Sequence, residues 1–229
     1  RASRTFPFVA KVMGNNFPDI ATKVLMSVPV QKNLNSLFEL DYVGVKAPQF
    51  SFTRLKGADP NLGVEMASTG EVGCLGQNFD EAFLKALNSV GYHFDIESVL
   101  FSTGPIESKA ELLDAARYFQ KVGTKFYATE GTAKFLNSNG FPVERLHWPL
   151  DEKQPNIIDY LKNGKIDLVI NIPKNYQKEE LTNGYLIRRA AIDYNVMLIT
   201  NRQLAMRFIE ALARNAHKKL KAAEWREYK

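Results

Sequence analysis

The chain has 229 residues, of which 45% are hydrophobic and 24% are charged, and its formal net charge is +5. This length suffices for one large or two small domains. The composition is that of a globular protein, and no apolar run is long enough to cross a membrane. The chain opens on Arg1-Ala-Ser-Arg4 without an initiator Met or a secretory cleavage pattern, so we expect a fragment of a longer cytoplasmic polypeptide.

Cysteine, histidine and charge narrow the chemistry further. The lone Cys74 excludes an internal disulfide and a cysteine-based metal cluster, and it fits a reducing cytoplasm. The three histidines have no ligand spacing, so we expect no metal site. The basic excess near the end of the chain lacks the interleaved aromatic residues of a nucleic-acid surface. It suits a small anionic ligand better.

The first part of the chain, residues 1–95, has few regular elements. We expect a helix at 19–26, a strand at 41–52 and a helix at 79–90. These elements are too few for a complete doubly wound sheet. The first part therefore has the pattern of a partial α+β closing lobe of a larger unit.

The second part, residues 96–229, alternates short apolar runs with helical periods. This alternation predicts an α/β domain with an open parallel five-stranded sheet covered on both sides by helices. The expected strands are 98–101, 125–128, 143–148, 167–171 and 196–199. The expected helices are 109–122, 133–138, 155–163, 182–194 and a long final helix capped by Asn201.

The turn Thr129-Glu-Gly-Thr132 joins the second expected strand to its helix. Two hydroxyls and a glycine at such a turn place free backbone N–H groups and the positive end of a helix dipole where an anion would sit. The alternative is that Thr129 or Thr132 only caps the helix. Taken alone, this stretch favours the alternative.

Hydrogen-bonding groups follow all five expected strands. Because the carboxyl ends of parallel strands meet at one edge of a sheet, these groups gather there. They are Ser102, Thr103, Thr129, Thr132, Trp148, Asn171, Lys174, Asn175, Thr200 and Asn201. Five such endings are better explained by a ligand site than by five separate structural roles.

Four stretches of the first part resemble the C-terminal end of the second ATP-grasp unit of the carbamoyl phosphate synthetase large chain. They are residues 1–9, 45–52, 57–63 and 65–71. That family makes carbamoyl phosphate from bicarbonate, ATP and ammonia, and this unit phosphorylates carbamate. Arg1 and Arg4 match the family's arginines beside the transferred phosphate, where guanidinium groups neutralise charge.

The same resemblance implies ATP and magnesium (or manganese) as cofactors of the full-length enzyme. The family's metal-binding residues would precede Arg1, so no cofactor is expected in this fragment. We therefore expect the chain alone to catalyse nothing.

Residues 127–132, 166–171 and 186–193 resemble the methylglyoxal-synthase-like domain of these synthetases. The resemblance implies an allosteric domain, which binds uridine or inosine nucleotides in some members and N-acetylglutamate in others. It assigns effector contacts to Ser102, Lys109, Thr129, Thr132 and Asn171. The loop at 172–176 lacks the glycines and the aspartate base of methylglyoxal synthases, so that activity is not expected.

The identity of the effector depends on two positions. Trp148 replaces a lysine of the nucleotide-binding members, and Trp148-Pro149 is similar to the members that respond to N-acetylglutamate. Lys174 replaces an asparagine of those members, and its cation would hold a phosphate or a carboxylate. We expect a small anionic effector, either a nucleotide or a molecule like N-acetylglutamate.

The resemblance also implies partners: the rest of the large chain, a glutaminase small chain and a homo-oligomer. Free ammonia is the alternative nitrogen source, and the product feeds arginine or pyrimidine biosynthesis. The alternative function is a non-catalytic docking or oligomerisation module. In that case the sheet edge is empty, and Arg188 and Arg189 on the helix at 182–194 form ion pairs.

Overall fold

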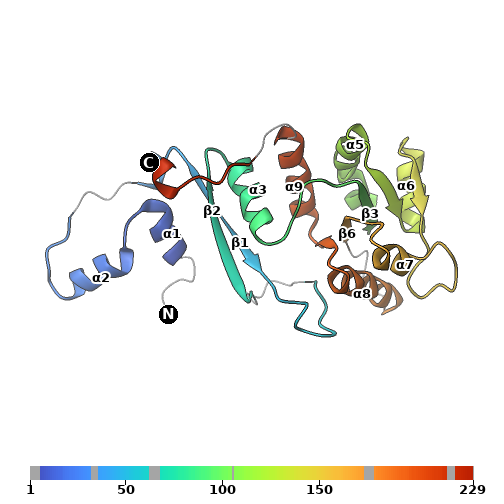
Figure 1. The fold of residues 1–229 in the computed structure, drawn as a ribbon, viewed down its shortest axis with the longest axis horizontal. Helices are drawn as coiled ribbons and strands as arrows, with labels where there is room; N and C mark the ends of the chain where they lie inside the picture. Colours follow the sequence, from blue (N-terminus) through green and yellow to red (C-terminus); the bar gives the residue numbers. More distant parts are fainter. Residues whose placement is uncertain are drawn as a thin grey trace. The chain divides into compact units, whose positions relative to one another are not determined.

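A computed structural model of the chain describes residues 6–31, 36–61, 68–104, 106–172, 178–215 and 220–228. Two compact units are present (Figure 1). The hairpin unit comprises Arg1–Gln49, Gly70–Val90 and His217–Lys229, and the sheet unit comprises Phe50–Thr69 and Gly91–Ala216. Both units are discontinuous in sequence, whereas the boundary expected at residue 95 concerns the family's domains and stays a prediction. Within the described ranges no helix is both long and apolar enough for a membrane span.

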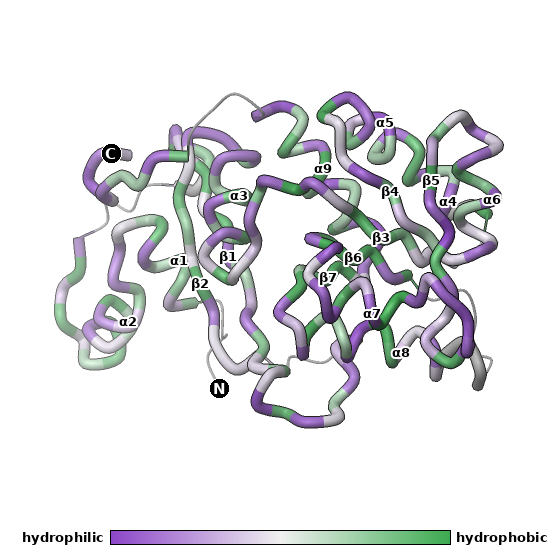
Figure 2. The backbone as a smooth tube through the Cα atoms, turned by 45° about the vertical axis from the view of Figure 1, so that its right-hand side comes forward, coloured by the Kyte–Doolittle hydropathy of each residue, from purple (hydrophilic) through white to green (hydrophobic). Residues whose placement is uncertain are grey.

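The sheet unit is built on five parallel strands in the order β5-β4-β3-β6-β7. The strands are β3 (Ser98–Thr103), β4 (Lys125–Ala128), β5 (Val143–Arg145), β6 (Leu168–Ile172) and β7 (Met197–Ile199). The central strands β3 and β6 are almost entirely buried and carry runs of hydrophobic residues (Figure 2). Such runs suit strands that are covered on both faces. The predicted α/β class and open five-stranded parallel sheet are confirmed.

Helices connect and cover these strands. They are α4 (Ile106–Glu111), α5 (Leu113–Lys121), α6 (Glu130–Ser138), α7 (Ile157–Lys162), α8 (Lys178–Asp193) and α9 (Arg202–Asn215). Helix α5 packs against α9, and α7 packs against α8. Beneath α7 and α8, Leu100 and Val169 of the sheet are buried with Ile157 and Ile187. This cluster fixes α8 beside β6.

Two expected elements of the sheet unit differ from those observed. The single helix expected at 109–122 is divided into α4 and α5, because Leu112 has a ψ of −3° that interrupts the helix. The strand expected at 143–148 ends at Arg145, since β4, its partner among the described strands, ends at the paired residue Ala128. Beyond that point His147 forms an isolated bridge with Asn156.

The hairpin unit is built on two antiparallel strands. These are β1 (Val43–Gln49) and β2 (Gly70–Gly76), and α3 (Phe79–Ser89) packs against both. The unit also contains α1 (Phe6–Met13), α2 (Phe17–Leu25), η1 (Leu37–Glu39) and η2 (Trp225–Tyr228). Gly76 is required at the contact with α3, because a Cβ there would lie 2.4 Å from the backbone nitrogen of Ala82. The described strand β1 is shorter than the predicted strand at 41–52, and α1 has no predicted counterpart.

Candidate functional site

The carboxyl ends of β3 and β6 lie at the point where the strand order reverses. From β3 the chain adds β4 and β5 on one side, and then returns to place β6 and β7 on the other. In open α/β sheets the crevice outside such a switch point is the usual ligand site. Ser102 of β3 and Asn171 of β6 are register partners there. We name Ser102, Lys109, Thr129, Thr132 and Asn171 the switch-point edge.

The two threonines of the turn after β4 have different roles. Thr129 is the N-cap residue of α6, and its carbonyl accepts from the backbone N–H of Ala133 at 2.8 Å, but its side chain makes no capping hydrogen bond. Thr132 lies inside α6, where Oγ1 donates to the carbonyl of Thr103 at 3.2 Å and accepts from its N–H at 3.3 Å. Thr132 therefore joins α6 to the end of β3, while the hydroxyl of Thr129 is left for another partner.

Ser102 and Thr129 are buried residues with uncommitted hydroxyls. They are 5% and 3% exposed. Within the part of the chain that the structure describes, neither hydroxyl takes part in a hydrogen bond with protein. Buried polar groups generally have a partner. Two such hydroxyls at adjacent strand ends are therefore suited to a ligand or an ordered water.

Asn171 adds a donor with a fixed orientation. Its side chain is 2% exposed, and Oδ1 accepts from Nη1 of Arg188 at 2.8 Å. A guanidinium group has only donors, so the amide oxygen must face Arg188 and the amide NH₂ must face away from it. Asn171 can thus donate to a ligand while its oxygen stays engaged.

Lys109 places a cation beside the first turn of α6. Its Nζ donates to the carbonyl of Gly131 at 3.4 Å. The carboxylate of Glu130 in the same turn would oppose an anion, but it pairs with Lys134 at 2.8 Å and with Arg145 at 3.0 Å. The hydrogen bond from Lys134 and the nearby Arg145 lower the pKa of Glu130. The local field therefore remains suited to an anion at the N-terminus of α6.

The remaining predicted site residues are Trp148, Arg1, Arg4 and Lys174. Trp148, just beyond β5, packs against the core cluster under α7 and α8, and its carbonyl accepts from Nδ2 of Asn156 at 2.9 Å. Trp148 thus has a packing role, and among the described residues it makes no hydrogen bond to the switch-point edge. Arg1, Arg4 and Lys174 lie outside the described residues, so their expected roles stay predictions.

Sequence reasoning did not connect Arg188 with Asp59. Nε and Nη2 of Arg188 donate to the two carboxylate oxygens of Asp59 at 2.7 and 2.6 Å. Burial alone would raise the pKa of Asp59, but hydrogen bonds from Arg188 and from the N–H of Asn61 outweigh it and lower that pKa. The two residues are 129 positions apart, and no local pattern links them.

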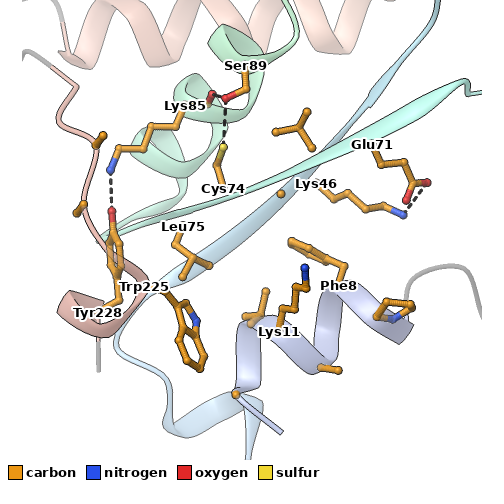
Figure 3. A pocket seen from close by; sticks show the side chains of 18 of the residues that line it. Phe8, Lys11, Lys46, Glu71, Cys74, Leu75, Lys85, Ser89, Trp225 and Tyr228 are labelled. Atoms are coloured by element: carbon orange, nitrogen blue, oxygen red, sulfur yellow. Dashed lines mark hydrogen bonds and ion pairs between the residues drawn. The ribbon is translucent and has the colours of Figure 1, made fainter. Parts of the chain in front are cut away.

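A separate cavity of about 1190 Å³ lies in the hairpin unit, lined by parts of α1, β2, α3 and residues 220–228 (Figure 3). Two of its lysines are already paired. Lys46 contacts Glu71 at 3.0 Å, and Lys85 contacts Glu81 at 2.5 Å and the hydroxyl of Tyr228 at 2.7 Å. None of the predicted effector residues in the described ranges lines this cavity. It is a weaker candidate for an anion than the switch-point edge.

Comparison with known proteins adds independent information. Residues 111–200 match the family described as MGS-like domain. The chain is 44% identical over 218 residues to the multifunctional protein pyr1-3 of Dictyostelium discoideum. The match covers 93% of this chain and 10% of that protein. The chain is also 42% identical over 221 residues to the mitochondrial carbamoyl-phosphate synthase [ammonia] of Rattus norvegicus, covering 93% of this chain and 15% of that protein. The chain thus spans only a small part of the length of these curated relatives.

Proposed function

We propose that the sheet unit is the regulatory part of a carbamoyl-phosphate synthase or a related multifunctional protein, because the chain is similar to such proteins over 93% of its length. In this proposal a small anionic effector binds at the switch-point edge. The full-length protein makes carbamoyl phosphate from bicarbonate, ATP and ammonia or glutamine. ATP and magnesium bind outside the described residues, and the chain alone is inactive.

The observation that carries effector binding is the excess of donors at the switch-point edge. Ser102 and Thr129 offer hydroxyls, Asn171 offers its NH₂ group, and Lys109 supplies a cation beside the N-terminus of α6. Carboxylate and phosphate oxygens are the acceptors that match such a set. Nucleotides and molecules like N-acetylglutamate both carry these oxygens.

The test is thermal unfolding of the chain with uridine monophosphate, uridine triphosphate, inosine monophosphate, phosphoribosyl pyrophosphate, ornithine and N-acetylglutamate. A compound at a hundred times its dissociation constant stabilises the folded state by about 2.7 kcal/mol. We expect a saturable rise in melting temperature with at least one anionic compound. Thr129→Ala and Ser102→Ala should each remove the rise, because each deletes a donor to the effector.

Ser98→Ala is the matched control. Ser98 lies at the opposite end of β3 and is equally buried, so its variant should lose stability yet keep the response to the effector. The proposal is wrong if none of the six compounds stabilises the wild-type chain, or if the rise survives in both Thr129→Ala and Ser102→Ala.

The docking alternative relied on Arg188 and Arg189 of α8. Arg189 pairs with Asp193 and donates to the carbonyls of Phe52 and Leu55 at 3.1 Å each. Arg188 is 1% exposed. Both guanidinium groups are therefore engaged inside the sheet unit, which weighs against their use on an oligomer surface. The glutaminase small chain and the homo-oligomer remain proposals for the full-length enzyme.

A further inference from the structure

Helix α8 holds a segment of the sheet unit that directly follows β1 of the hairpin unit in the sequence. Residues 50–61 follow β1 of the hairpin unit but belong to the sheet unit, where they lie beside α8 (Figure 1). Tyr185 donates its hydroxyl to the carbonyl of Gly57 at 3.0 Å. Arg189 donates to three carbonyls of the segment, those of Phe52, Leu55 and Ala58. The segment is therefore held by side chains of α8 rather than by strand pairing.

Arg188 contacts this segment and the switch-point edge at the same time. Its Nε and Nη2 bind Asp59 of the segment, and its Nη1 binds Asn171 of the edge. Arg188 is 1% exposed, so these acceptors, rather than water, compensate the positive charge of its guanidinium. Removing a partner from a buried charge is costly. A change at Asn171 must consequently alter the balance of the bonds to Asp59.

Gly184 leaves room for this arrangement. A Cβ at Gly184, one turn before Arg188 in α8, would lie 3.0 Å from Nη1 of Arg188 and 3.8 Å from Oδ1 of Asn171. Glycine is a poor residue for a helix interior, and alanine is the best. Glycine at this position lowers the helix propensity of α8, but it lets the guanidinium of Arg188 approach the amide of Asn171.

We propose that Arg188 is a positioning residue that couples occupancy of the switch-point edge to the order of residues 50–61. This inference rests on the proposed function. Arg188 turns the NH₂ of Asn171 toward the ligand position, and an anion that accepts from this NH₂ makes Oδ1 a stronger acceptor, because linked hydrogen bonds polarise one another. The guanidinium is then held more firmly, together with Asp59. Binding and ordering are reciprocal, so a loosened segment weakens binding by the same factor.

The first test needs no ligand. Amide hydrogen exchange of residues 50–61 is compared in the wild-type chain, Asn171→Ala and Gly184→Ala. Asn171 does not bond to the segment directly, yet we expect its variant to exchange about tenfold faster there, the scale of one lost charge-assisted hydrogen bond. Gly184→Ala displaces the guanidinium from the helix side without deleting a polar group, and should act in the same direction.

Thr129→Ala is the control for this comparison. It changes the same edge without a bond to Arg188, so exchange at 50–61 should stay at the wild-type rate. Wild-type exchange at 50–61 in Gly184→Ala, or in folded Asn171→Ala, overturns the proposal. Either result is obtained without any effector.

The second test adds uridine triphosphate or N-acetylglutamate, each at saturation. We expect slower exchange at 50–61 in the wild-type chain with the compound that raises its melting temperature, and no such change in Arg188→Gln. Arg188→Lys should not restore the response, because one ammonium cannot bridge Asp59 and Asn171 as the planar guanidinium does. If Arg188→Lys restores the response, a positive charge alone is sufficient at this position, and the proposal is overturned.

Arg189→Gln is the matched control of the second test. It loosens the same segment by removing donors to its carbonyls but leaves the bond to Asn171, so the response to the compound should persist. A response in Arg188→Gln equal to wild type overturns the coupling. If none of the six compounds stabilises the wild-type chain, the proposed effector class fails, while the ligand-free comparison still decides the coupling.

Discussion

The two ends of β3 carry equally buried serines with different surroundings. At the amino end, Ser98 donates its hydroxyl to Oδ2 of Asp167 at 2.8 Å, and the same oxygen accepts from the N–H groups of Ser98 and Glu97. At the carboxyl end, the hydroxyl of Ser102 makes no hydrogen bond within the described residues. The amino end is saturated by the protein and fastens β3 to β6. The carboxyl end keeps donors available, and that difference separates a structural edge from a binding edge.

The largest effect should come from breaking the amino end. Asp167→Ala removes the shared acceptor of three donors and leaves the N–H groups of Ser98 and Glu97 without this partner. We expect a loss of about 3 kcal/mol in the free energy of unfolding in urea, because hydrogen bonds to charged groups are the stronger ones. Asp167→Asn keeps an acceptor and should lose less. A loss below about 1 kcal/mol in Asp167→Ala would contradict a saturated structural edge.

The two threonines of the carboxyl end provide an intermediate test. Thr132→Val keeps the side-chain shape but leaves the buried N–H of Thr103 without its acceptor, so we expect a loss of about 1–2 kcal/mol in urea. Thr129→Val also keeps the side-chain shape and removes only an uncommitted hydroxyl, so it should lose less than about 0.5 kcal/mol. Equal losses in the two variants would show that the hydroxyl of Thr129 is also structural.

Acid should produce the smallest effect on stability. It acts on Asp59, which holds Arg188 and through it Asn171 at the carboxyl end of the sheet. Because its folded-state pKa is lowered, Asp59 contributes stability above its unfolded pKa, about 4, and this contribution is lost as the pH falls through the folded pKa. The difference in unfolding free energy between wild type and Asp59→Asn should be level from pH 7 to about 5 and shrink below about 4. The side chain of Asp59 is 40% exposed, so we expect the pH-dependent part of this difference to stay below about 1 kcal/mol. A difference that grows in acid would contradict this sign.

Local patterns in the sequence predicted the sheet because each strand is a short apolar run between turns. The range expected for β4 agrees with the observed Lys125–Ala128, and Ser102 and Asn171 lie side by side as parallel strand ends require. The break at Leu112 was missed because both flanking stretches have helical periodicity. The early end of β5 depends on its neighbour, which a single segment does not reveal.

The site was predictable only where its chemistry lies at strand ends. The contact between Arg188 and Asp59 joins residues 129 positions apart, and its meaning depends on the third partner, Asn171. Gly184 likewise resembles an ordinary helix defect until the guanidinium beside it is known. Long-range pairing of this kind has no periodicity and no spacing, so sequence reasoning gave Arg188 only the general role of an ion-pair former.

The position of residues 50–61 in the sheet unit also limits which segments can be exchanged between related proteins. A graft of residues 96–215 between relatives would carry Arg188 and Asn171 but leave Asp59 behind. The transplanted helix would then hold a buried cation without its carboxylate. The two proteins must therefore also have matching residues in the stretch after β1. The segment that can be exchanged as a unit includes this stretch as well as the sheet.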